Sequence, residues 1–246
     1  MNIRNATIRA AATLAITAAF TLTACQPEPD PAAVRAAQAA AQEQEAGTMA
    51  KQFDDAFAQE KWELARAFGD VLIDKFPDSA AAERIQAQHS EATINARTER
   101  ENRRTAALWT YQTQPVDRGE QISAAIYSTE PVDVADGVPQ RVRLIFRDHP
   151  EWGRSSYLVL GSGDFDCYGG CRVPVKIDDA APQAMAASRP KTDEAIAMFI
   201  EDERALWRMI GDAERVSIEF PVKAGGRRTA EFEVAGLDDS RLPGWD

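Results

Sequence analysis

The spacing of apolar residues changes at Trp109, and this change limits the architectures open to the chain. Before it, large apolar residues recur at helical intervals, as Met49, Phe53 and Phe57 do. After it, short segments alternate apolar and polar residues between Gly, Pro and Asp, which is the period of a half-buried strand. The sequence therefore predicts an α+β chain, in which a helical region is followed by a β-rich domain over residues 109–246.

The helical region is expected to contain three helices. An Ala- and Gln-rich segment runs to about Gly47 with little to bury, so it should face solvent. It follows a proline-containing tether, and the two together form residues 25–47. Within residues 48–108, a second helix should begin near Trp62 and stop at Pro77. Asp78 or Ser79 can then cap a third helix that runs to about Leu108.

The second helix and its end resemble a single tetratricopeptide-type helical hairpin. The match consists of Ala65, the sequence Phe76-Pro77-Asp78-Ser79 and the alanines that follow, within about forty residues. The usual Gly and Tyr positions of the first helix are not evident. One such repeat does not bury its faces alone. We therefore expect it to pack on the third helix, on the C-terminal domain or on another chain.

The second half of the third helix is charged on all sides. Arg97 with Glu101, and Glu99 with Arg103, are spaced to form i,i+4 ion pairs on an exposed helix. Two interpretations remain open for this segment. It is either a rigid arm or partner surface, or a solvated linker helix.

The C-terminal region should form a mainly antiparallel, sandwich-like β domain with one packed helix. The helix is expected over Asp202–Ala213, with Leu206, Met209 and Ile210 as its apolar stripe. Nine strands are expected, at about 109–114, 121–128, 141–147, 155–160, 172–177, 183–187, 195–200, 215–221 and 229–234.

The order of features in this domain is similar in outline to the C-terminal domain of type VI secretion accessory proteins of the TagO/VasI type. The similarity rests on segments such as 157–160, 171–178 and 232–237, and on the closing Pro243-Gly244-Trp245. It covers about 135 residues, and its motifs are structural. It implies a non-enzymatic periplasmic module that serves a secretion or envelope-assembly system.

Residues 1–24 have the features of a signal peptide. Arg4 and Arg9 precede an apolar stretch that is too short to remain as a transmembrane helix. The stretch ends in Leu22-Thr23-Ala24-Cys25, which resembles the lipobox of bacterial lipoproteins. The resemblance implies cleavage before Cys25 and lipid on its thiol, and Gln26 implies sorting to the outer membrane, with the protein on its periplasmic face. An ordinary signal peptide, with Cys25 present by chance, is the alternative.

The other two cysteines, Cys167 and Cys171, are expected to form a structural disulfide in an oxidising periplasm. A redox pair is the alternative, but the Cys-x-x-Cys spacing is missing. The loop around them, with Asp164, Phe165, Asp166 and Tyr168, is a candidate recognition loop. Weak cation binding by its two aspartates stays open, although the segment does not fit the EF-hand pattern and no metal site is predicted.

No catalytic pattern stands out, so the chain is not expected to be an enzyme. It has neither a Gly-x-Ser-x-Gly motif nor a glycine-rich phosphate loop after a strand. His149 sits in a turn, far in sequence from His89. A net charge of −11 argues against nucleic acid as a partner, and no cofactor is implied.

Three functions remain after these exclusions. The first is a lipid-anchored binding or scaffolding protein with a protein partner in the envelope. The second is an inhibitor or immunity protein against a cell-wall hydrolase, for which the acidity is suitable because many such hydrolases are basic. The third is a hydrolase whose site is not recognisable from the sequence.

Overall fold

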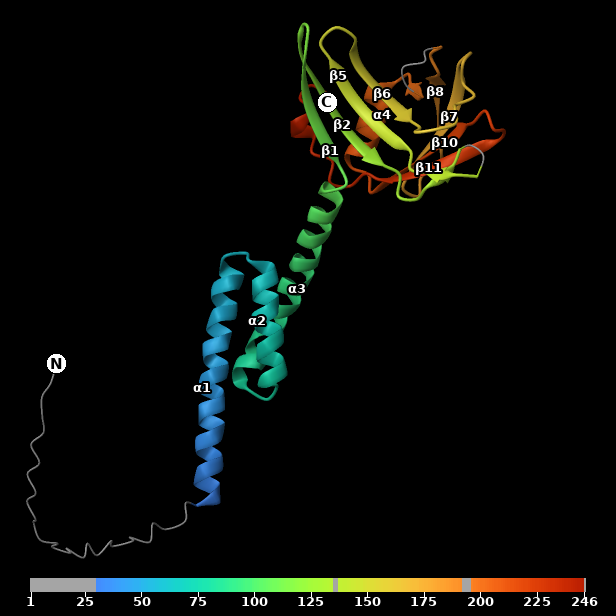
Figure 1. The fold of residues 1–246 in the computed structure, drawn as a ribbon. Helices are drawn as coiled ribbons and strands as arrows, with labels where there is room; N and C mark the ends of the chain where they lie inside the picture. Colours follow the sequence, from blue (N-terminus) through green and yellow to red (C-terminus); the bar gives the residue numbers. More distant parts are fainter. Residues whose placement is uncertain (1–29, 135–136, 192–195, 246) are drawn as a thin grey trace, which may run out of the picture.

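The computed structural model describes residues 30–134, 137–191 and 196–245, which form an N-terminal helical region and a C-terminal β domain (Figure 1). The predicted α+β class is confirmed. The helices are α1 (Pro31–Ala58), α2 (Trp62–Lys75), α3 (Ala80–Ala106) and α4 (Glu203–Gly211), with a 3-10 turn η1 (Asp239–Arg241). The strands are β1 (Thr110–Val116), β2 (Gly119–Tyr127), β3 (Val132–Asp133), β4 (Pro139–Gln140), β5 (Arg143–His149), β6 (Gly153–Val159), β7 (Cys171–Ile177), β8 (Gln183–Ser188), β9 (Ala197–Ile200), β10 (Arg215–Pro221) and β11 (Arg227–Glu233).

The first three helices pack into a small bundle with its own core. Phe53 from α1, Leu72 from α2 and Ile85 from α3 are fully buried in it. Each such side chain contributes about 1.5–3 kcal/mol when it leaves water. Ser79 caps α3, because its Oγ accepts a hydrogen bond from the backbone N–H of Ala82. The hairpin therefore packs on the third helix, which is one of the three expected arrangements.

The first half of α1 is exposed, as its composition predicted. The expected division at residues 47 and 48 falls inside this helix, which continues through Gly47 without a break. The packed second half of α1 supports the exposed first half, because a helix that has already formed extends at little cost.

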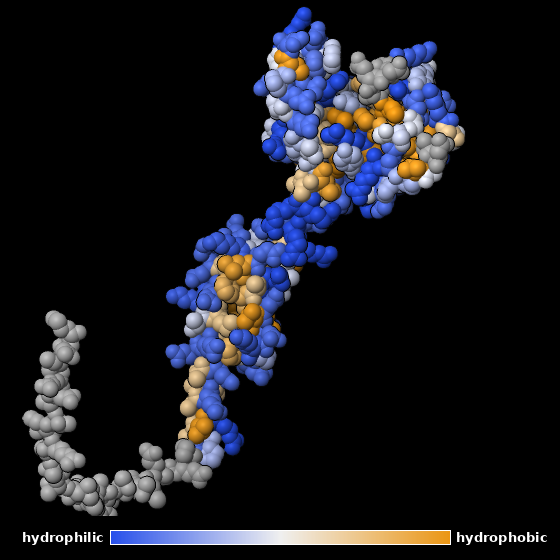
Figure 2. Space-filling model, viewed as in Figure 1, coloured by the Kyte–Doolittle hydropathy of each residue, from blue (hydrophilic) through white to orange (hydrophobic). Residues whose placement is uncertain are grey.

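Helix α3 connects the bundle to the β domain. Its 27 residues correspond to about 40 Å at 1.5 Å per residue. The two parts lie at opposite ends of α3 (Figure 1), and the stretch between them is strongly hydrophilic (Figure 2). Arg103 pairs with Glu99 as predicted, with 3.6 Å between Nη1 and Oε2. Glu101 forms its salt bridge with Arg104, and the charge of Arg97 also lowers the pKa of Glu101, so the expected pair is present as a weaker, longer-range attraction.

The end of α3 contacts the turn after β11. The indole Nε1 of Trp109 donates to the carbonyl of Val234 at 3.1 Å, in a buried position. Arg104 of α3 pairs with Glu233 at the end of β11. Gly236, with a φ of 82°, lies directly against the backbone of the last turn of α3. These three contacts fix where the helix meets the β domain.

The β domain is built on one nine-stranded sheet in the order β1-β2-β5-β6-β9-β8-β7-β10-β11. All neighbouring strands are antiparallel. Both halves of the sheet contribute to a single core, for example Phe146 from β5 and Phe232 from β11. The backbone N–H of Thr129, after β2, also donates to Glu231 of β11 at 2.8 Å. The sheet thus curves around its core, which gives the sandwich-like arrangement that was expected.

Helix α4 packs into this core, as predicted. Leu206 and Ile210 of the expected stripe are fully buried, and Met209 is half-buried against the core. Trp207, which the predicted stripe did not include, is also buried, and its ring meets Phe146 edge-on with 5.1 Å between centroids. All nine expected strands are present. The short pair β3 and β4 was not expected, because two-residue strands give no periodic signal.

Candidate functional site

The predicted lipid attachment site at Cys25 lies outside the described residues, as does the whole signal segment. Across residues 30–134, 137–191 and 196–245, no helix has the length and apolar character needed to span a membrane.

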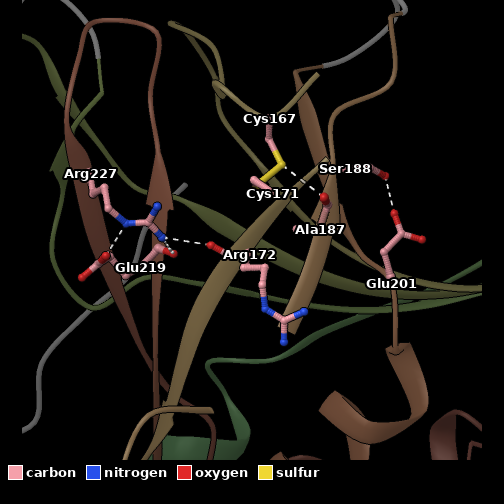
Figure 3. The surroundings of a disulfide bond; sticks show 8 residues. All are labelled: Cys167, Cys171, Arg172, Ala187, Ser188, Glu201, Glu219 and Arg227. Carbon is pink, nitrogen blue, oxygen red and sulfur yellow. Dashed lines mark hydrogen bonds and ion pairs between the residues drawn. A yellow bond between two sulfur atoms is a disulfide. The ribbon is translucent and has the colours of Figure 1, made fainter. Parts of the chain in front are cut away.

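Cys167 and Cys171 form a disulfide, as predicted, with 5.3 Å between their Cα atoms. The bond joins the loop before β7 to the first residue of that strand (Figure 3). The tight connection needs Gly170, whose φ is 86°. Sγ of Cys167 lies 3.2 Å from the carbonyl oxygen of Ala187 on β8 and is buried. The burial of Cys167 favours the structural interpretation over the redox pair.

Asp164, in the predicted recognition loop, is the centre of an ion-pair cluster. Its Oδ1 accepts from Nε of Arg189 at 2.9 Å, and its Oδ2 lies 2.9 Å from Nζ of Lys223. Tyr168 also donates its hydroxyl to Oδ2, and Lys223 lies over the Tyr168 ring. Burial of the Asp164 carboxyl raises its pKa, but the hydrogen bonds from Tyr168, Arg189 and Lys223 outweigh burial and hold the pKa well below its ordinary value.

The contacts of residues 164–168 hold the candidate recognition loop in one conformation. Phe165 is fully buried and meets Phe220 edge-on, so its ring anchors the loop in the core. Tyr168 is half-buried beneath two cations, and Asp166 is exposed. The loop therefore presents a fixed surface, and the oxygens of Asp164 are already occupied by protein donors. Weak cation binding by Asp164 and Asp166 is disfavoured for this reason.

The two histidines make local contacts. Nδ1 of His149 accepts from the backbone N–H of Glu151 at 3.1 Å, which is the turn predicted at this position. His89 bonds Asp70 within the bundle, with 2.8 Å between Nε2 and Oδ1. No group of three or more His, Cys, Asp and Glu residues suited to a metal ion is present in the part of the chain that the structure describes.

The outward face of β2, β5, β6 and β9 carries a second cluster that the sequence did not identify as a site. We call it the arginine face, and it consists of two arginines with the aromatic residues around them. Its members are Tyr127, Arg143, Arg147, Trp152, Tyr157 and Phe199.

Arg147 lies between two aromatic rings of this face. Its guanidinium carbon is 5.4 Å from the centroid of Trp152 and 5.3 Å from that of Tyr157. Arg143 lies over Tyr127 at 5.6 Å. Such cation–π contacts orient the flat guanidinium groups along the rings. The signal available in the sequence was the alternation along 141–147, which predicted one dry and one mostly wet face for this strand.

Two of the rings of the arginine face pack against further rings. Tyr157 packs against Phe199 on β9 with 5.0 Å between centroids, and Trp152 stacks on His149 at 3.9 Å. Burial raises the pKa of Tyr157, while the charges of Arg147 and Arg143 lower it. Both arginines therefore act electrostatically on the same ring.

Comparison with known proteins gives no relative. The chain matches no family model, no curated protein and no solved structure. The contacts described above are therefore the basis for any assignment of function.

Proposed function

We propose that this chain is an envelope lipoprotein, held by lipid on Cys25, that acts as a periplasmic binding or scaffolding module. The observation that carries the proposal is the position of the β domain. It lies at the far end of α3 from the bundle, and the chain enters the bundle through the exposed first half of α1. A protein tethered before α1 would hold its β domain well away from the membrane surface.

The contacts at the junction support this interpretation of α3 as a rigid arm. A flexible linker does not need specific packing contacts with the domain that it carries. Here the buried Trp109 hydrogen bond and the close approach of Gly236 hold the end of α3 in one place. Such a fixed geometry suits a module whose task is to present a surface at a defined height.

The partner that we propose is a protein of a secretion or envelope-assembly system. The outline similarity of residues 109–246 to secretion accessory proteins supports this choice. The loop around Asp164 and the arginine face provide charged groups and aromatic contact area, which are typical of protein-binding surfaces. An inhibitor of a cell-wall hydrolase would use the same anchor and the same arm.

The proposal is tested by cross-linking in cells that make the full-length chain. Photo-reactive residues placed at exposed positions of the β domain should give protein adducts, which mass spectrometry then identifies. Matched positions on the exposed half of α1 are the control, and Cys25→Ser removes the anchor. Adducts with secretion or assembly proteins would support the proposal, whereas adducts with a hydrolase would favour the inhibitor. Equal adducts from α1 and from the β domain would contradict both.

A further inference from the structure

We propose that the arginine face binds an extended, acidic peptide segment of a partner protein, with one carboxylate at Arg143 and a second at Arg147. The inference deepens the proposed function by naming the partner's chemistry. It rests on that function only for the place in the cell, the envelope, where the partner is found.

The first observation is that both arginines lack an acidic partner. Neither side chain forms a salt bridge or a hydrogen bond with the described residues, although the chain contains 39 Asp and Glu residues. The Nε atoms of Arg143 and Arg147 are buried and unpartnered. Their Nη atoms have no hydrogen-bond partner among the described residues and are not enclosed, so these are the donors that a bound carboxylate can reach.

The second observation is the composition of the surrounding face. The outward positions that pair in register around the two arginines contain no Asp or Glu among the described residues. They are Thr110, Gln112 and Gln114 on β1, Gln121, Ser123, Ala125 and Tyr127 on β2, Ile145 and His149 on β5, Ser155, Tyr157 and Val159 on β6, and Ala197 and Phe199 on β9.

The other end of the same sheet differs in charge. Its outward positions carry both signs, because Glu219, Glu231 and Glu233 lie among Lys176, Arg215 and Arg227, and Arg227 pairs with Glu219. Glu201, which follows β9 at the border of the arginine face, hydrogen-bonds Ser188 of β8 (Figure 3). Among the described residues, the arginine face therefore differs in that its two cations have no carboxylate paired with them, which suits an acidic ligand.

The spacing of the arginines selects the shape of the ligand. Arg143 and Arg147 are four residues apart on one strand, which corresponds to about 13 Å between Cα atoms. The two guanidinium groups lie over different rings, Arg143 over Tyr127 and Arg147 over Trp152 and Tyr157, so each is oriented to bind its own acidic group. Two carboxylates four residues apart on an extended peptide have the same spacing, because both chains advance by the same rise per residue. A dense polyanion such as nucleic acid would be repelled by the rest of a chain with a net charge of −11.

The aromatic residues provide the remaining contact area. Trp152 and Tyr127 are 66% and 52% exposed, at the two ends of the face. Exposed rings beside unpaired arginines are the residue types that contribute most to binding at protein interfaces. They would cover the side chains that lie between and beside the two carboxylates of the peptide.

The test uses fluorescence anisotropy with the full-length chain in detergent. The probe is a labelled, β-branched peptide with two aspartates four residues apart. A peptide with asparagines at the same positions and one with adjacent aspartates are the comparison ligands. Arg143→Gln and Arg147→Gln should each weaken binding of the first peptide about tenfold, since a charge-assisted hydrogen bond contributes at least that factor. The single variants Arg35→Gln and Arg97→Gln, on the exposed faces of α1 and α3, each remove the same one positive charge and should bind normally.

Three results would overturn the inference. These are no binding at millimolar peptide, equal binding of the asparagine peptide, and equal losses in the Arg35→Gln and Arg97→Gln controls. Tighter binding to anionic lipid vesicles or polyphosphate than to the peptide would also overturn it. If Arg147→Gln unfolds by circular dichroism, Arg147→Lys keeps the charge and should still weaken binding, because the flat stack is lost. Peptide binding without lipid on Cys25 would refute the proposed function alone, and lipid without peptide binding would refute this inference alone.

Discussion

Replacing Gly236 with Ala should weaken the packing of the end of α3 against the β domain and so lower the free energy of unfolding. An added Cβ would lie 2.5 Å from the backbone nitrogen of Ala106 and 2.7 Å from the carbonyl carbon of Thr105. These are backbone atoms of the last turn of α3, so neither can rotate away. The substitution also places a side chain on a residue with a φ of 82°.

The magnitude follows from these two effects. A left-handed conformation costs a residue with a Cβ about 1–2 kcal/mol, and forced overpacking costs about 1–3 kcal/mol more. Gly153→Ala is the matched control, because Gly153 has a φ of 71° and nothing within 4 Å of the added Cβ. It should therefore cost only the backbone contribution. The clash at the junction is then the difference between the two variants.

Urea unfolding followed by tryptophan emission measures this difference. Four of the five tryptophans lie in the β domain, so the signal reports mainly on that domain. We expect Gly236→Ala to lower the free energy of unfolding by about 1–3 kcal/mol more than Gly153→Ala does. Equal losses would refute the close contact between α3 and the turn after β11.

Three further predictions concern other parts of the β domain. Reduction of Cys167–Cys171 should cost about 2 kcal/mol of the free energy of unfolding, because the ring that it closes is small; a loss near zero in a reductant titration would count against that role. The pKa of Asp164 is lowered in the folded state, so its stabilisation is complete above the unfolded value of 3.8 and disappears as the pH falls through the folded value. Asp164→Asn should cost about 2 kcal/mol at neutral pH, because the hydrogen bonds from Tyr168, Arg189 and Lys223 lose their charged acceptor, and should flatten this acid-side dependence in pH-resolved unfolding. Trp109→Phe should cost about 0.5–1.5 kcal/mol in thermal or urea unfolding, because the Val234 carbonyl loses one of its two donors and keeps the backbone N–H of Leu237; an unchanged midpoint would show that the indole hydrogen bond does not stabilise the junction.

The elements of the fold were predictable because their periodicity is local. The alternation of Val142, Leu144 and Phe146 with polar neighbours identified β5, and Pro77 marked the end of the second helix within two residues. The disulfide was predictable because only one pairing was left once Cys25 was assigned to lipid. Residues near in sequence decide each of these features.

The candidate sites were less predictable because strand register decides them. Asp164 meets Arg189 and Lys223, which are 25 and 59 positions away along the chain. Arg147 meets Tyr157 only because β5 and β6 pair with Ile145 opposite Tyr157. Alternation predicts which residues share a face of one strand, but it does not predict which strand lies beside it. The arginine face was therefore missed.

The presence of lipid on Cys25 tests the central claim most directly. The full-length chain, made in a host with lipoprotein processing, is extracted from membranes, and the mass of its N-terminal peptide is measured. We expect the peptide to begin at Cys25 and to carry a diacylglyceryl group, with Cys25→Ser losing both the added mass and the membrane association. An unmodified Cys25, or a Cys25→Ser chain that stays equally with the membrane, would contradict the claim that this cysteine anchors the protein.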